Sequence, residues 1–110
     1  MPSRTMLSSR ERALYSKLRW LLNEPGLLRG NLVVARRRCG KPTCRCHRDE
    51  SQRHRSLYLA ISVAGQRRTV YIPERWEPRV QEWCGRYAQV RKLLEELSQS
   101  FQKRLEDRRE

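Results

Sequence analysis

Three of the chain's four cysteines lie within eight positions, from Cys39 through Cys44 to Cys46. This spacing constrains the fold more than any other feature, because thiols so close in sequence must share one small loop. The rest of the sequence offers little for a large core: the chain has 110 residues, of which 37% are hydrophobic, with a single Phe. With so small a hydrophobic core, we expect the fold to need a further stabilising element such as a metal ion. The cluster is therefore predicted to stabilise the fold.

The cysteine spacing is more typical of a metal site than of a disulfide. The N-terminal segment has no apolar run of secretory length, so we expect a cytoplasmic protein whose thiols stay reduced. Cys44 and Cys46 are too close for an unstrained disulfide, and the Cys-x-x-Cys spacing of redox motifs is absent. Zinc binds nitrogen and sulfur ligands tetrahedrally, so the thiols predict a zinc site that lacks one ligand. Incidental reduced thiols or a redox role are the alternatives.

Three residues are candidates for the fourth zinc ligand. His54 lies eight residues after Cys46 and can return to the cluster once the loop folds back, and we favour it. His47 is adjacent to Cys46, where ligation would need a cramped geometry. Cys84 is least favoured, because it falls inside a predicted helix and is more typical of a partly buried structural thiol. The predicted zinc ligands are Cys39, Cys44, Cys46 and His54.

The chain is strongly basic, with 25 Lys and Arg against 12 Asp and Glu and a net charge of +13. Residues 29–55 hold nine of the basic side chains and two acidic ones. Of the 25 basic residues 21 are Arg, whose planar guanidinium binds phosphate bidentately and stacks on bases. This pattern favours DNA or RNA as a partner, although a solvated basic surface has a similar composition. The predicted nucleic-acid-binding residues are Arg36, Arg37, Arg38, Lys41, Arg45, Arg48, Arg53, Arg55, Arg67 and Arg68.

Hydrophobic periodicity predicts an α+β fold in a single domain, residues 1–110. The clearest signal is the alternation of apolar residues over 57–63, which is typical of a half-buried strand. A reversal at Gly65 joins it to a second alternating run and predicts a hairpin. The predicted elements are an N-terminal helix over 9–23, a small antiparallel three-stranded sheet over 31–72 with strands starting near 31, 57 and 67 and stabilised by the zinc loop, and a long helix over 78–108.

The long C-terminal helix carries a heptad seam. Apolar residues recur in alternating steps of three and four, a spacing that is typical of a coiled coil. The seam would either pack against the helix over 9–23 in the same chain or pair with a second copy or a partner protein. The predicted seam residues are Val80, Trp83, Tyr87, Val90, Leu94, Leu97 and Phe101.

The hairpin strands also carry aromatic residues beside basic ones. Tyr58 and Tyr71 lie in its two strands, near Arg67 and Arg68. One face of the hairpin could therefore stack on unpaired bases. The alternative is that each Tyr packs against a helix, as Tyr on a strand more often does.

No sequence pattern indicates an enzyme, a small-molecule substrate or a membrane segment. The acidic residues outside the last helix are scattered, without the paired spacing of a metal nuclease. A zinc ion with four protein ligands also has no open coordination position. No nucleophile-elbow or phosphate-loop pattern is present, and no apolar stretch approaches the roughly 20 residues of a membrane span.

Taken together, the motifs resemble a family of small uncharacterised proteins of bacteria, archaea and phages. The family has a zinc-ribbon-like cysteine motif, a β-hairpin ending in Tyr-Ile-Pro and a long C-terminal helix, and the likeness covers residues 30–97. In this family the His is usually followed by Gly-Pro, whereas this chain has Arg55-Ser56. The resemblance is carried by Arg38, Cys39, Gly40, Lys41, Pro42, Cys44, Cys46, His54, Tyr58, Tyr71, Ile72, Pro73 and the heptads over 80–97.

The resemblance implies an association with mobile elements and phage genes, but no particular activity. With the charge pattern, it leads us to expect a zinc-containing nucleic-acid-binding accessory factor. The alternative is a coiled-coil interaction subunit of a larger transposase, recombinase or reverse transcriptase, with no nucleic-acid affinity of its own.

Overall fold

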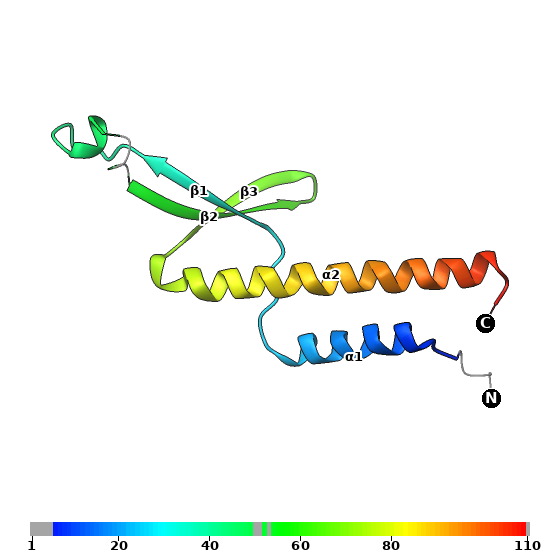
Figure 1. Cartoon of the computed structure of the whole chain (residues 1–110). Coiled ribbons are helices and arrows are strands. Elements are labelled where there is room, and N and C mark those ends of the chain that lie inside the picture. The colour runs from blue at the N-terminus through cyan, green and yellow to red at the C-terminus, as the bar shows by residue number, and fades with distance from the viewer. Residues whose placement is uncertain (1–5, 50–51, 53, 110) are drawn as a thin grey trace. The chain divides into compact units, whose positions relative to one another are not determined.

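The chain has the α+β architecture that the sequence predicts, an N-terminal helix, a three-stranded antiparallel sheet and a long C-terminal helix (Figure 1). This computed structural model describes residues 6–49, 52 and 54–109, so the predicted Arg53 lies outside the described residues. No helix in the described part of the chain is long and apolar enough to cross a membrane. The elements are α1 (Ser9–Asn23), β1 (Asn31–Arg37), η1 (Arg45–His47), β2 (His54–Val63), β3 (Gln66–Ile72), η3 (Glu74–Trp76) and α2 (Glu77–Glu106).

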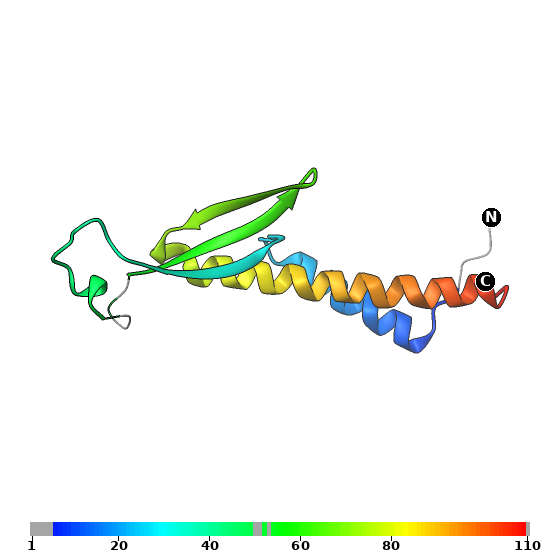
Figure 2. The ribbon, with the colours of Figure 1, turned by 90° about the horizontal axis from the view of Figure 1, so that it is seen from above.

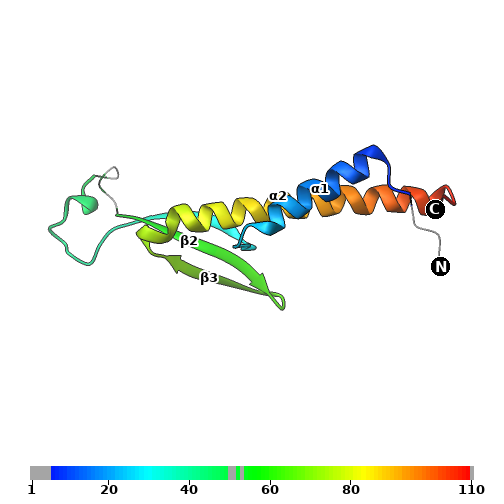
Figure 3. The same ribbon diagram turned by 90° about the horizontal axis from the view of Figure 1, so that it is seen from below.

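The three strands form one sheet in the order β1-β2-β3, with β2 in the centre. Figure 3 shows β2 and β3 side by side as the predicted hairpin. β2 begins three residues before the predicted start at 57, because its pairing with β1 continues as far as the pair of Arg37 and His54. The loop between β1 and β2 therefore starts and ends at that pair.

The described chain divides into two compact units. Of the described residues, those up to Leu27 and those from Gly85 onward form the helical unit, and those from Leu28 to Cys84 form the sheet unit. α2 contributes its first turns to the sheet unit and the rest to the helical unit. The single domain over residues 1–110 stays a prediction.

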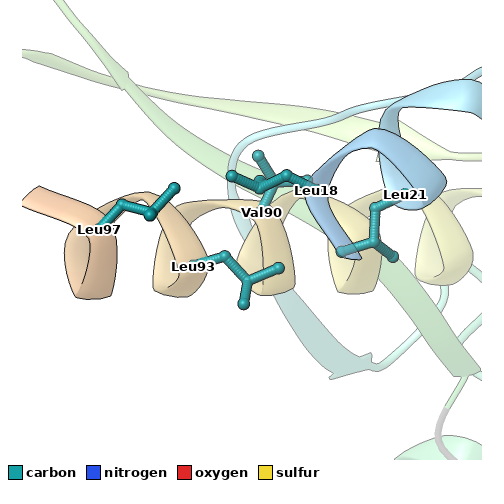
Figure 4. Close-up of a cluster of buried hydrophobic side chains, with 5 residues drawn as sticks. All are labelled: Leu18, Leu21, Val90, Leu93 and Leu97. Carbon is teal, nitrogen blue, oxygen red and sulfur yellow. The ribbon is translucent and has the colours of Figure 1, made fainter. Parts of the chain in front are cut away.

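In the helical unit, α1 packs against α2 through a narrow apolar seam. Figure 4 shows the buried side chains that form it, Leu18 and Leu21 of α1 with Val90, Leu93 and Leu97 of α2. This arrangement is the intrachain alternative for the predicted seam, and Phe101 also packs against it. Pairing through a second copy stays a prediction.

Tyr87 and Leu94 are predicted seam residues that do not belong to this core. Leu94 is 55% exposed, and its neighbour Leu93 is 7% exposed and takes the core position. Core positions at 90, 93 and 97 keep steps of three and four, but in a register different from the predicted one. The packing of α1 on α2 therefore determines which face of α2 is buried.

The two ends of the helix pair are joined by polar contacts of buried side chains. At one end, Glu11 is 1% exposed and accepts hydrogen bonds from the Ser8 backbone N–H (2.9 Å), the Ser100 hydroxyl (2.5 Å) and Arg104 Nε (3.0 Å). At the other end, the buried Arg86 donates to the carbonyls of Pro25 (2.7 Å) and Gly26 (2.6 Å). These contacts orient α1 antiparallel to α2.

Glu11 also completes the N-cap of α1. Its backbone N–H donates to the Ser8 side chain at 3.1 Å, while its carboxylate accepts from the Ser8 N–H, which forms a capping box. Arg104 makes an ion pair with the same carboxylate. The Arg104 hydrogen bonds, followed by those from Ser100 and Ser8, lower the pKa of Glu11 far below its ordinary value.

Replacing Glu11 with Gln is expected to destabilise the protein by far more than the roughly 0.5 kcal/mol scatter of surface substitutions, because Arg104 loses its charged partner. The control is Glu95→Gln, at an exposed position of α2. The wild type should also lose stability as pH falls below about 4.3, since the unfolded Glu11 then binds a proton that the folded one does not. Urea unfolding at pH 7 compares the two variants, and equal midpoints would contradict the role of Glu11. Urea unfolding of the wild type at pH 7 and pH 3 measures the pH dependence, and equal midpoints at the two pH values would contradict it.

In the sheet unit, one face of the sheet packs against the first turns of α2. Leu57, Leu59 and Ile72 form a buried cluster with Val80, and Trp76 and Trp83 cover its edge. The two indole rings are 6.0 Å apart in an edge-to-face arrangement. The predicted seam residues Val80 and Trp83 therefore serve the core of this unit, together with the half-buried Cys84.

Gly30, just before β1, permits the chain to pass close to this core. Its φ is +152°, and a Cβ there would lie 2.6 Å from Leu59 Cδ1 and 2.8 Å from Ile61 Cγ2. Both clashes involve side chains of the sheet core, so relief would disturb its packing.

Gly30→Ala is expected to lower the free energy of unfolding by about 1–3 kcal/mol through overpacking and backbone strain. The matched control is Gly85→Ala, since a Cβ at this helical position meets nothing within 4 Å. The control should raise the free energy of unfolding by about 0.5–1 kcal/mol, because Ala restricts the unfolded chain and favours a helix. Urea denaturation of both variants makes the comparison, and loss of stability in both would refute the local explanation.

Candidate metal centre

The cysteine cluster lies in the loop between β1 and β2 (Figure 2). The ladder of β1 and β2 ends at Arg37 and His54, so the two ends of the loop are held side by side. Cys39 follows the end of β1 by two residues, and His54 is the first residue of β2. This explains how a ligand eight residues after Cys46 can reach the cluster.

Local hydrogen bonds fold the described part of the loop back toward Cys39. The Cys44 N–H donates to the Lys41 carbonyl at 3.1 Å and closes a turn with Pro42 at its second position, where the fixed φ of Pro is favourable. The His47 N–H then donates to the Cys44 carbonyl at 3.1 Å and begins η1. This pair of tight turns presents the Cys44 and Cys46 side chains on a short stretch of chain.

The structure brings the four predicted ligands together. The ligand atoms of Cys39, Cys44, Cys46 and His54 all lie within 4.8 Å of one another. The Sγ atoms of Cys39 and Cys46 are 3.5 Å apart, and Cys44 Sγ is 3.6 Å from His54 Nε2. In a tetrahedral site with Zn–S bonds of about 2.3 Å, two sulfur ligands lie about 3.8 Å apart. The donor set and its spacing could therefore hold a metal ion, and the thiols are free of disulfides.

Backbone N–H groups also point at the sulfur atoms. The Cys39 N–H donates to Cys46 Sγ at 3.2 Å. A hydrogen bond from the Cys46 backbone N–H, followed by those from His54 and the other thiols, lowers the pKa of Cys44 to about 6. Burial raises the pKa of Cys46. A lowered pKa favours the thiolate form of Cys44, the form in which a cysteine binds metal.

The other two candidates for the fourth ligand lie outside the cluster. His47 Nε2 donates to the Cys39 carbonyl at 2.7 Å, so it supports the backbone of a ligand. Such a contact orients the residues of a metal site without touching the metal. Cys84 is half-buried in the core of the sheet unit, and burial raises its pKa. The sequence analysis does not predict this supporting role. The position of His47 next to Cys46 nevertheless indicates that its side chain lies close to the cluster.

The predicted nucleic-acid-binding residues differ in what the fold does with them. Six of them lie exposed on the end of β1 and on the loop, namely Arg36, Arg37, Arg38, Lys41, Arg45 and Arg48. Arg55 instead forms an ion pair with Glu77 at 2.9 Å. Arg67 and Arg68 are both exposed on β3, but as adjacent residues of a strand they point to opposite faces of the sheet.

The fold and the clustered ligands define a small α+β protein with a candidate Cys3His metal site in a loop of its sheet. Residues 7–82 match a family described as Domain of unknown function (DUF6788), and the chain belongs to this family. The match runs from before α1 to the first turns of α2, and so includes the whole cluster. Comparisons with curated proteins and with solved structures gave no match.

Replacing Cys44 with Ser is expected to abolish binding of the metal ion and to lower the thermal stability of the sheet, since folding of small metal sites is coupled to binding. Cys84→Ser is the matched control, because Cys84 lies outside the cluster. Native mass spectrometry with and without a chelator counts the metal ions, and circular dichroism follows unfolding. A Cys44→Ser protein that keeps both its metal and its stability would contradict the assignment of this ligand.

Proposed function

We propose that this protein is a zinc-containing nucleic-acid-binding protein that contacts DNA or RNA mainly through phosphates. The observation that carries the proposal is the group of six exposed cations on the end of β1 and on the loop, on the same short segment as the Cys3His cluster. We call these cations, which lie within residues 36–48, the basic loop group. Exposed Arg side chains at such density are typical of a phosphate-binding surface.

Zinc is the metal that best fits three thiolates and one imidazole. Together with three thiolates and a neutral imidazole, the zinc site carries a net charge of about −1, and the ion has no open coordination position. We therefore assign it a structural role and propose no catalysis. Its effect is to hold the basic loop group in one arrangement, which lowers the entropy that must be lost when the loop binds phosphates.

The cellular role rests on the family resemblance rather than on geometry. Association of similar proteins with mobile elements and phages supports an accessory factor for nucleic-acid transactions. A surface that binds phosphates has little sequence preference of its own, which suits a factor that assists another protein.

Replacing Arg36, Arg37 and Arg38 with Ala is expected to weaken binding of an oligonucleotide on the order of tenfold or more at about 50 mM salt, and to make the salt dependence shallower by up to about 0.9 per lost phosphate contact. The metal content should not change. The control removes equal charge from exposed positions of α1, with Arg10, Arg12 and Arg19 replaced by Ala. Fluorescence anisotropy over a salt series measures both quantities. Equal losses in the two triple variants would show that net charge matters and that the basic loop group does not.

The second candidate is an interaction subunit of a larger nucleic-acid enzyme. It is favoured by large apolar side chains exposed in the helical unit, namely Trp20 (69%), Leu22 (53%), Leu94 (55%) and Leu105 (68%). Absence of oligonucleotide binding at about 50 mM salt would favour this candidate over the first, because phosphate contacts are strongest at low salt.

A further inference from the structure

The sheet unit leaves one face of its sheet outside the core. Leu57 and Leu59 of β2 point into the buried cluster, so Tyr58 between them points to the opposite face. We call this the outer face. Tyr58 pairs with Val33 on β1 and with Tyr71 on β3, so one row of side chains crosses all three strands.

The aromatic rings of this row are arranged for contact with a ligand. The rings of Tyr58 and Tyr71 meet edge to face, with centroids 5.7 Å apart. On the two edge strands, Tyr71 is 57% exposed and Val33 is 39% exposed, so both side chains are accessible to a ligand. The next row toward the hairpin turn has small side chains at its centre and on β3, where Ala60 is buried and Thr69 is exposed.

The charge of the outer face is complementary to a polyanion. The Arg37 guanidinium lies over the Tyr58 ring, 5.5 Å from its centroid, and Arg67 lies on the same face near the hairpin turn. No Asp or Glu occurs in β1, β2 or β3, all of which are described. Along the strands, Arg37 and Arg67 lie on opposite sides of this row, Arg37 toward the loop and Arg67 toward the hairpin turn. Cations beside aromatic rings are typical of surfaces that bind single strands of nucleic acid.

The alternative for the two Tyr residues, packing against a helix, does not account for them. The buried cluster of the sheet unit, with the partly buried side chains around it, includes neither Tyr58 nor Tyr71. Trp76 and Trp83, on η3 and α2, supply its aromatic contacts. The stability of the core therefore does not explain why Tyr71 is aromatic.

We propose that the outer face binds a single strand of nucleic acid, with one unpaired base stacked on Tyr71, the next beside Tyr58, and phosphates on Arg37 and Arg67. This inference rests on the proposed nucleic-acid binding and names its substrate class. Stacking needs a free base face, which a duplex does not offer along its length. Stacking is sequence-tolerant, so it adds affinity for unpaired strands without adding sequence preference.

Metal-loaded protein and a labelled single-stranded oligothymidine of about 20 nucleotides test the proposal, with an abasic oligomer of the same length as the probe that has phosphates but no bases. Tyr71→Ala should weaken binding of the oligothymidine about 5-fold to 100-fold and leave binding of the abasic oligomer unchanged. Tyr71→Phe keeps the ring and should bind like the wild type. Trp20→Ala is the control, because it removes an exposed aromatic ring from the helical unit.

The salt dependence separates stacking from phosphate binding. Tyr71→Ala should lower affinity for the oligothymidine without changing the slope against salt concentration, whereas the Arg36, Arg37 and Arg38 substitutions should make that slope shallower. Photocrosslinking with iodouracil gives a second readout that needs no variant. The crosslinked peptide should contain Tyr58 or Tyr71.

Four results would overturn the proposal. Wild-type affinity in Tyr71→Ala, with weak binding by the triple Arg variant, would leave nucleic-acid binding intact and remove the outer face from it. If Tyr71→Ala weakened binding of the oligothymidine and of the abasic oligomer equally, the substitution would have a general structural effect. Crosslinks confined to the basic loop group would show that the bases bind there and not on the outer face. Failure of every oligomer to bind at about 50 mM salt would instead refute the proposed function itself.

Discussion

The loop between β1 and β2 has almost no hydrophobic interior, and this constraint governs the rest of the sheet unit. Within its described residues, Cys46 is the one buried side chain, and it is buried against other ligands of the cluster. A loop of this kind cannot be ordered by apolar burial, since too little area leaves water to offset the loss of conformational entropy. Two interactions remain that can order the loop. They are hydrogen bonds to sulfur and a metal ion shared by Cys39, Cys44, Cys46 and His54.

His54 is both a candidate ligand and the first residue of β2. A metal ion that orders the loop would therefore also fix the first residue of β2. Its partner in the ladder is Arg37, the residue whose guanidinium lies over Tyr58. The cluster, the basic loop group and the outer face therefore meet at one pair of residues. Loss of metal would free the end of the ladder first, and the position of Arg37 with it. Under the proposed function, metal content and binding of a polyanion would be coupled through this backbone pairing, without any contact between metal and polyanion.

The sequence predicts the features that depend on residues close together in the chain. It does not predict the contacts between residues that are far apart in the chain. The bounds of α1, the hairpin at Gly65 and the grouping of His54 with the three thiols follow from local spacing. The ion pair of Glu11 and Arg104 joins residues far apart in sequence, and no spacing rule connects them. The choice of Leu93 over Leu94 depends on how α1 lies on α2, which a heptad count assumes and cannot determine. The sequence suggests His47 only as a metal ligand, and it does not predict the hydrogen bond from His47 to the Cys39 carbonyl.

A net charge of +13 does not by itself distinguish a nucleic-acid-binding surface from a solvated one, but the contacts of individual Arg residues show which of them the fold already uses. Arg104 neutralises the buried Glu11, Arg86 donates to carbonyls at the end of α1, and Arg55 pairs with Glu77. These side chains are held by the fold, and binding a phosphate would break contacts that stabilise it. The members of the basic loop group are exposed and lie on the loop that carries the clustered thiols, and Arg37 also lies over the Tyr58 ring. Under the proposed function, these are the basic residues that bind phosphates, while the fold uses the others for its own packing.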